Sequence, residues 1–275
     1  MQHDCWATTI EERRGPCEFG DRSSATTLVL LGDSHAEHWL GALDRAGRER
    51  GFKVIAMVKG GCPVPDMPEL MQPRLKRWYH ECTRFREAMI RRIIALRPAA
   101  VILSSWDHYM PLNGNGSDWQ VTPDIWRRGL RRTYTRLSAA GIKTVAMRGT
   151  PRTWFDVPGC LSRQAAQLPA ARRCEYERAR AFSPVAIAAQ NEAARGLPVR
   201  FVDMNDIICK TSPVPGHPQR HRHLHRRQPS HPQFQPLRRS SARGEARCGV
   251  AVAREQFIGL SGFRMLCSAQ PVKGG

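Results

Sequence analysis

The 275-residue sequence has no long apolar segment. A membrane-spanning helix needs roughly 18 or more consecutive apolar residues, and no stretch approaches that length. The first residues, MQHDCWATTIEERRG, carry acidic and basic side chains where a signal peptide would have its apolar centre. We therefore predict no membrane span and no export signal, and a cytoplasmic location if the chain is expressed as written.

The sequence also lacks a Cys-x-x-Cys pair, which argues against a zinc or redox site, and we predict no metal and no cofactor. It holds nine cysteines, a density typical of proteins from an oxidising compartment. Their local spacing predicts three disulfides that close short loops: Cys5–Cys17, Cys62–Cys82 and Cys160–Cys174. Cys209 is then left over.

Acidic residues are scarce, with 24 Asp and Glu against 43 Lys and Arg and a formal net charge of +19. Such a charge would ordinarily indicate a polyanionic partner such as nucleic acid. The excess is uneven, because residues 214–275 hold 11 basic residues against 2 acidic ones. From residue 214 the sequence also has no helix or strand period, so this tail needs an explanation of its own.

Hydrophobic periodicity predicts alternating strands and helices before the tail. Five short apolar runs indicate strands, the first from Thr27 and the others at 52–58, 99–104, 142–147 and 199–203. The helices expected between them span residues 37–50, 76–96, 123–140 and 183–194. This alternation predicts a doubly wound α/β fold, with a five-stranded parallel sheet in the order 2-1-3-4-5.

The first strand ends in Gly32-Asp33-Ser34-His35, and a helical pattern follows. A serine at the carboxyl end of such a strand lies in the crevice where open α/β sheets bind ligands, with unpaired helix amides beside it. Ser34 is therefore a candidate nucleophile. Asp and Ser are also favoured in turns and at helix N-caps, so both interpretations stay open at this point.

Other motifs accompany this one: Cys17-Glu18-Phe19-Gly20-Asp21, Ala36-x-His38-Trp39 and Lys59-Gly60-Gly61-Cys62-Pro63. Together they resemble the SGNH domain at the C-terminus of membrane-bound acyltransferase-3 O-acetylases, which modify bacterial lipopolysaccharide or peptidoglycan glycans. The resemblance covers roughly residues 5 to 212. It implies a flavodoxin-like three-layer α/β/α SGNH-hydrolase fold and a Ser-His-Asp triad whose Asp and His come from a late Asp-x-x-His motif.

The function that the resemblance implies is O-acyl transfer, above all of acetyl groups, to a glycan hydroxyl in the periplasm. Its partners would be a glycan acceptor and an acyl donor, supplied through a fused membrane acyltransferase domain, and no nucleic acid. The alternative in the same chemistry is a carbohydrate esterase. A non-catalytic fragment or a basic nucleic-acid-binding protein is the alternative from another class.

The expected catalytic groups lie at three strand ends. Ser34 would be the nucleophile, and the backbone amides of Ser34 and Gly61 would hold the oxyanion. Asp33 and Trp106 would line the oxyanion and substrate region. The Gly-x-Asn-Asp segment of wider SGNH hydrolases is absent, and Asn113 or Asn115 could substitute for its asparagine.

No general base is evident in the sequence. His35 is expected to be structural, and His38 could line the pocket. Asp203 and Asp206 lie near the end of the fifth strand, and Asp206 is expected to serve in a cap or turn. What the predicted crevice lacks is the base that a serine nucleophile needs.

The missing Asp-x-x-His can be found in another reading frame. Back-translation of residues 214–235 with third bases chosen among the permitted ones, read one base later, gives CPAIRNGIVTYTDANHLTRSFS, with Asp at the position of Arg226 and His at that of Pro229. The shift also creates a cysteine at position 214, a partner for Cys209. We therefore expect that a frameshift leaves the SGNH fold incomplete at its C-terminus and the chain inactive as written.

Two rival interpretations of the tail remain. One is a metal-binding tract at His221-x-His223-x-His225, and the other is a basic, disordered arm that binds nucleic acid. The domain boundaries that we predict are a disulfide-containing lead-in at 1–25, the SGNH domain at 26–213 and a disordered, frameshift-derived tail at 214–275.

Overall fold

The computed structural model describes residues 6–12, 17–110, 118–153, 155–167, 174–208, 247–250 and 265–268. Two compact units are present, one formed by residues 1–152 with 182–205 and the other by residues 153–181 with 206–275. In the described parts of the chain, no helix is both long and apolar enough to span a membrane. The same residues contain no group of three or more His, Cys, Asp or Glu side chains that could hold a metal ion.

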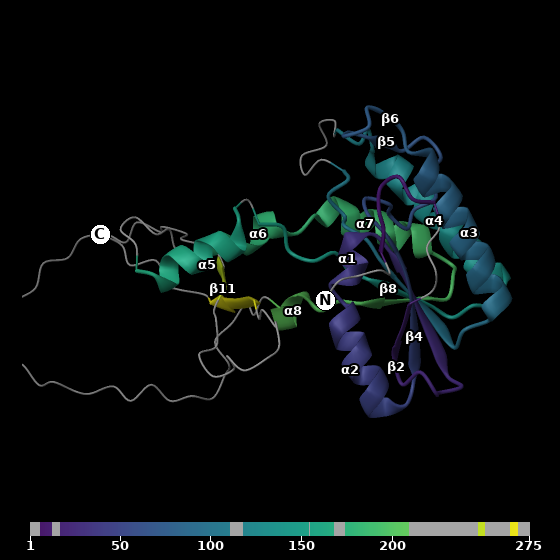
Figure 1. Ribbon diagram of the computed structural model, residues 1–275. Helices are drawn as coiled ribbons and strands as arrows, with labels where there is room; N and C mark the ends of the chain where they lie inside the picture. The colour runs from purple at the N-terminus through teal and green to yellow at the C-terminus, as the bar shows by residue number, and fades with distance from the viewer. Residues whose placement is uncertain are drawn as a thin grey trace, which may run out of the picture. The chain divides into compact units, whose positions relative to one another are not determined.

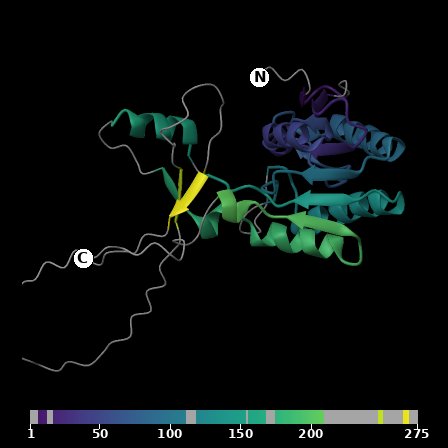
Figure 2. The same cartoon turned by 90° about the horizontal axis from the view of Figure 1, so that it is seen from below.

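The first unit is built on a parallel sheet. Its five main strands pair in the order β4-β3-β7-β8-β10, and the arrows of β8 and β10 point the same way in Figure 2. Their bounds are β3 Thr27–Gly32, β4 Lys53–Lys59, β7 Ala100–Ser104, β8 Thr144–Met147 and β10 Val199–Val202. This is the order that the sequence predicts, and every pairing along it is parallel.

The prediction of a five-stranded sheet is wrong in its count, because two strands of the lead-in join the sheet. β1 (Trp6–Ala7) pairs with β4 in parallel, and β2 (Cys17–Gly20) pairs with β4 antiparallel, which makes seven strands. Strands of two and four residues are too short to show a period of two in the sequence. They are formed by pairing with β4 rather than by a pattern of their own.

Helices cover both faces of this sheet (Figure 1). One face packs against α3 (His80–Leu96), α4 (Pro123–Ala139) and α7 (Pro184–Ala194), and the other against α1 (Ser34–Glu37) and α2 (Leu40–Arg50). Along β3 the buried side chains alternate, with Val29 and Leu31 in the larger core and Leu30 in the smaller one. A central parallel strand buried on both faces explains why its sequence is continuously apolar.

Two predicted helices differ from those observed. The helix expected at 37–50 is divided into α1 and α2, and α1 is capped by Asp33, whose side chain accepts from the His35 amide. The helix expected at 76–96 begins only at His80, because β5 (Met71–Gln72) and β6 (Arg77–Trp78) pair as a short hairpin before it. Both differences lie at helix starts, where caps and turns override the apolar period.

The second unit contains α5 (Val157–Ala165), β9 (Glu175–Glu177), α6 (Arg178–Ala181) and most of α8 (Asn205–Ile208). Two further strands, β11 (Arg247–Val250) and β12 (Met265–Ser268), form an antiparallel sheet with β9 in the order β12-β11-β9. Disorder throughout 214–275 is thus wrong for these two strands, where apolar residues return to the sequence. Residues 214–246 lie outside the described residues.

Two of the predicted disulfides join described residues, one in each unit. Cys62–Cys82 joins the segment after β4 to the first turn of α3, and Cys160–Cys174 closes a loop after α5. Cys17 is disulfide-bonded, whereas Cys5, its predicted partner, and Cys209 lie outside the described residues.

Candidate active site

The carboxyl ends of three adjacent strands meet at one edge of the sheet. Gly32, the last residue of β3, is in register with Val58 of β4 on one side and Ser104 of β7 on the other. A Cβ atom at Gly32 would lie 1.7 Å from the Ser104 carbonyl oxygen, so only glycine allows this approach. The segments that leave this edge carry Ser34, Gly61 and Trp106.

Asp33 is the most constrained residue of this edge. Its buried carboxylate accepts hydrogen bonds from the His35 amide (2.8 Å to Oδ1), the Trp106 amide (3.0 Å to Oδ2) and the Tyr109 hydroxyl (2.9 Å). Burial raises the pKa of Asp33 to about 6, against the opposite effect of these hydrogen bonds. The predicted place of Asp33 in the substrate region is therefore corrected: its side chain is enclosed, and it holds the turn around Ser34 in place.

Ser34 itself is half-buried at the start of α1. Within the described residues its hydroxyl makes no hydrogen bond, and its backbone amide has no acceptor. A first-turn amide cannot bond within its own helix, which accounts for the free N–H. The residue therefore offers both a hydroxyl and a backbone donor.

Gly61 lies in the turn after β4 with φ of 63°, a conformation that favours glycine. A Cβ atom there would approach Trp119 to 3.1 Å and Gln72 to 3.3 Å. Among the described residues nothing accepts from the Gly61 amide, whereas the carbonyl of Gly60 accepts from the Tyr79 hydroxyl at 2.7 Å. The amides of Gly61 and Ser34 are thus two unbonded donors that follow neighbouring strands.

Both histidines near Ser34 are engaged elsewhere or exposed. His35 Nδ1 lies 3.0 Å from the Thr150 hydroxyl, and the His35 ring lies 5.9 Å from that of Trp106 and 4.6 Å from that of His38. Burial, then the charges of His38 and His108, lower the pKa of His35 to about 3, so its imidazole is neutral at physiological pH. His38 is exposed, and burial of part of its ring lowers its pKa.

Comparison with known protein families identifies the family of this chain. The chain matches the family described as "SGNH domain (fused to AT3 domains)" over residues 4–246. It belongs to the SGNH domain family. The matched range extends past residue 213, where the sequence analysis places the end of the domain.

Several solved structures are similar to this SGNH domain. The periplasmic domain of a lipopolysaccharide acetyltransferase from Salmonella ser. Paratyphi A is 12% identical, with 70% of this chain and 71% of that chain covered and a TM-score of 0.49. A GDSL-like lipase from Bacteroides thetaiotaomicron is 16% identical (65% and 68% covered, TM-score 0.34), and the esterase EstA from Pseudoalteromonas sp. is 14% identical (66% and 80% covered, TM-score 0.38). No curated protein matches the chain.

The segment after β7 places Asp107, His108 and Tyr109, which were not predicted from the sequence, beside the expected Trp106. Trp106 is half-buried, and its ring lies 5.5 Å from Tyr109 and 5.7 Å from His108. Asp107 lies beside His108, with 3.3 Å between Oδ1 and Nε2, and burial raises the pKa of Asp107 to about 7. Asp107, His108 and Tyr109 are buried by contacts with residues distant in the sequence. Their segment has no hydrophobic periodicity from which this burial could have been predicted.

The remaining described candidates, Asp203 and Asp206, make contacts away from Ser34. Asp203 accepts from the Asn205 amide at 2.9 Å, and Asp206 pairs with Arg178 at 2.6 Å. Asn113 and Asn115 lie outside the described residues, as do the three histidines of the tail. Among the described residues, none of these groups hydrogen-bonds the Ser34 hydroxyl.

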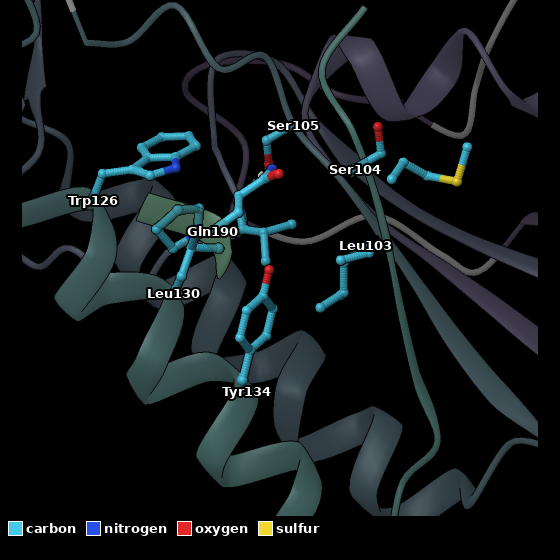
Figure 3. A pocket seen from close by; sticks show the side chains of 11 residues that line it. Leu103, Ser104, Ser105, Trp126, Leu130, Tyr134 and Gln190 are labelled. Carbon is cyan, nitrogen blue, oxygen red and sulfur yellow. Dashed lines mark hydrogen bonds between the residues drawn. The ribbon is translucent and has the colours of Figure 1, made fainter. Parts of the chain in front are cut away.

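A small pocket lies on the side of β7 that faces α4 (Figure 3). Its volume is about 10 Å³, and Ser105, Trp126, Tyr134 and Gln190 are among its lining residues. A cavity needs roughly 10–15 Å³ to hold a single water molecule, so this pocket is too small for an acyl group or a sugar. Trp126 Nε1, which is buried there without a hydrogen-bond partner in the described structure, has room for a water at most.

Proposed function

We propose that this SGNH domain is built for serine-dependent O-acyl transfer, with an acetyl group passing to a hydroxyl of a cell-surface glycan. The observation that carries the proposal is that Ser34 and Gly61 follow the paired strands β3 and β4 at the same edge of the sheet. Ser34 has a hydroxyl and an amide that bond nothing in the described structure, and the unbonded Gly61 amide follows the neighbouring strand. A nucleophile beside two free backbone donors is the arrangement that acyl transfer requires.

In the proposed reaction Ser34 Oγ attacks the carbonyl carbon of an acyl donor. The carbonyl π electrons move to oxygen, and the amides of Ser34 and Gly61 bind the resulting oxyanion. Its collapse expels the donor's leaving group and leaves an acyl ester on Ser34. The glycan hydroxyl then attacks this ester, gives up its proton and releases the serine.

Each of these steps needs a base that accepts and returns the serine proton. The His35 ring is directed to Thr150, and Asp107 and His108 are buried behind Trp106. We infer that the chain in its present sequence is inactive, because the family's Asp-x-x-His is absent. A reading frame shifted after codon 213 would place Asp at position 226 and His at position 229.

The periplasm is the compartment that fits this proposal. Two disulfides in the described structure are what an oxidising compartment produces. The acyl donor and the glycan would meet the domain there, through the membrane acyltransferase domain to which members of the family are fused.

Restoring the reading frame tests the proposal. The gene around codon 214 is resequenced, a frame-corrected chain is exported, and both chains are assayed on p-nitrophenyl acetate with and without a glycan acceptor. The corrected chain should hydrolyse the ester, Ser34→Ala should abolish the gain, and the present chain should stay near the uncatalysed rate.

The acceptor then separates the two functions that share this chemistry. Acetylated glycan among the products supports a transferase, and acetate alone indicates the carbohydrate esterase. A folded, corrected chain without activity would contradict the assignment of Ser34 or the frameshift. Stoichiometric binding of the present chain to RNA or DNA would favour the basic binding protein instead.

A further inference from the structure

The Gly60–Gly61 peptide is held on one side only. The Gly60 carbonyl accepts a hydrogen bond from the Tyr79 hydroxyl at 2.7 Å, and the Gly60 amide donates to the Ala7 carbonyl at 2.9 Å. The Gly61 amide of the same peptide has no acceptor in the described structure. This amide is therefore free to donate to a bound molecule.

The geometry of a peptide couples these two groups. The carbonyl oxygen and the amide hydrogen point in opposite directions across a planar trans peptide. The Tyr79 hydroxyl, by fixing the direction of the Gly60 carbonyl, also fixes that of the Gly61 N–H. This matters at two consecutive glycines, because glycine tolerates both signs of φ and the peptide between them could otherwise rotate at little cost.

Tyr79 is itself firmly placed. Its side chain is completely buried, and its amide donates to the Leu70 carbonyl at 2.8 Å. The buried Lys59 ammonium lies 5.3 Å from the Tyr79 ring and donates to the carbonyls of Thr8, Thr9 and Glu11. Burial raises the pKa of Tyr79 above its ordinary value, so the phenol remains a hydrogen-bond donor.

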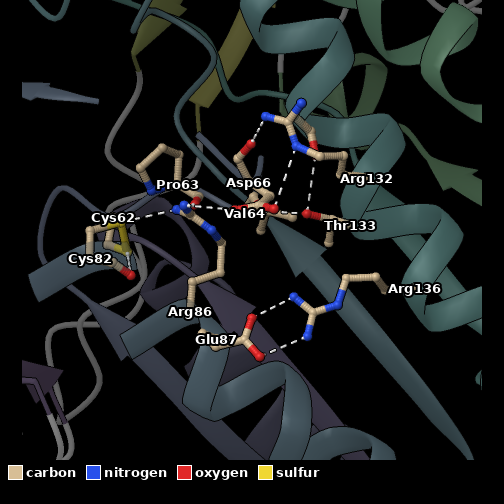
Figure 4. A network of polar contacts seen from close by, with 11 residues as sticks. Cys62, Pro63, Val64, Asp66, Cys82, Arg86, Glu87, Arg132, Thr133 and Arg136 are labelled. Carbon is tan, nitrogen blue, oxygen red and sulfur yellow. Dashed lines mark hydrogen bonds and ion pairs between the residues drawn. A yellow bond between two sulfur atoms is a disulfide. The ribbon is translucent and has the colours of Figure 1, made fainter. Parts of the chain in front are cut away.

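The segment that follows Gly61 is anchored at the same end of α3. Cys62 is joined to Cys82 by a disulfide, and the buried Arg86 contacts Cys82 Sγ at 3.2 Å and Asp66 at 3.2 Å (Figure 4). Tyr79 and Cys82 therefore hold the chain on the two sides of Gly61. Both lie at the start of one helix, which makes this helix the support of the turn.

We propose that Tyr79 is a positioning residue for the oxyanion donor, which keeps the Gly61 amide directed toward the acyl group on Ser34. The inference rests on the proposed function, since it names the residue that pre-sets one of the two donors. Oxyanion donors work because they are fixed before charge develops and need no reorganisation. A peptide between two glycines meets this requirement only when another group holds it.

Amide spectroscopy on the full chain labelled with ¹⁵N-glycine tests this inference. In Tyr79→Phe we expect the Gly61 cross-peak to shift and to broaden by exchange on the μs–ms timescale of backbone rearrangement. Tyr134→Phe is the matched control, because it removes a hydroxyl from another buried tyrosine. In the control the Gly61 cross-peak should stay at its wild-type position.

Acetate, a product-like oxyanion, is the ligand that separates the two proposals. In the wild type it should shift the Gly61 cross-peak, and Tyr79→Phe should bind it about tenfold more weakly, as expected for a weakened hydrogen bond to a charged group. A Gly61 cross-peak that is identical in the wild type and in Tyr79→Phe would overturn the positioning role. A cross-peak that moves in Tyr79→Phe, without any response to acetate in the wild type, supports the positioning of the peptide and contradicts the proposed function.

Discussion

Replacement of Asp33 by Asn should make the domain more stable at neutral pH and leave it nearly unchanged in acid. The carboxylate is buried, and its pKa rises from 3.8 to about 6. A folded-state pKa above the unfolded value means that protonation stabilises the fold. This stabilisation is fully present below pH 4 and is lost as the pH rises through 6.

The expected gain in free energy of unfolding follows from the pKa shift of Asp33. A change from 3.8 to about 6 corresponds to about 3 kcal/mol at 1.36 kcal/mol per pKa unit. Asn can still accept from both amides, because Oδ1 lies 2.8 Å from the His35 amide and 3.2 Å from the Trp106 amide. The hydrogen bond with Tyr109 would reverse, with Nδ2 donating to the hydroxyl. The charge of Asp33 also raises the pKa of Asp107, so its removal acts in the same direction there.

Urea unfolding at pH values from 4 to 8 measures the prediction. The difference in free energy of unfolding between Asp33→Asn and the wild type should grow by up to about 3 kcal/mol over this range. Tyr109→Phe is the complementary variant, because it removes a hydrogen bond that favours the ionised carboxylate. It should lose more stability above pH 6 than below. The reasoning is refuted if Asp33→Asn is equally destabilised at all pH values.

Two further sets of variants test how Gly32 and the Cys62–Cys82 disulfide stabilise the domain around Ser34. Gly32→Ala places a Cβ atom 1.7 Å from the Ser104 carbonyl oxygen and should lower the free energy of unfolding by at least about 3 kcal/mol or prevent folding. Gly41→Ala is the control, because nothing lies within 4 Å of its Cβ atom, and it should raise the free energy of unfolding by up to about 1 kcal/mol. Equal urea midpoints of the two variants would contradict this prediction. Joint replacement of Cys62 and Cys82 by Ser removes a disulfide with a sequence separation of 20 and should lower the free energy of unfolding by about 3 kcal/mol. An unchanged urea midpoint in the absence of reductant would show that the disulfide does not stabilise the domain.

The sheet could be predicted from the sequence because its main strands carry continuous apolar runs. Val29, Leu30 and Leu31 are buried on alternate faces of β3, which is why that segment is apolar without interruption. β1 and β2 could not be predicted, since they owe their conformation to pairing with β4. Local patterns therefore revealed the central strands and missed those at the edge.

In the candidate site, too, local features could be predicted from the sequence and long-range contacts could not. The position of Ser34, between the end of β3 and the start of α1, could be predicted because strand, turn and helix are consecutive in the sequence. The contacts of Asp33 with Tyr109, and of His35 with Thr150, join residues 76 and 115 positions apart. No periodic pattern records such contacts, and the enclosed state of Asp33 therefore emerged only from the folded structure.

Covalent labelling shows whether Ser34 is the nucleophile and whether the present chain lacks the base that activates it. The present chain and the frame-corrected chain are incubated with an activated phosphonate ester, and their peptides are mapped by mass spectrometry. Our account predicts stoichiometric modification of Ser34 in the corrected chain and almost none in the present chain, because only the former has a base to activate the hydroxyl. Rapid modification of Ser34 in the present chain, or modification of another residue in the corrected chain, would contradict it.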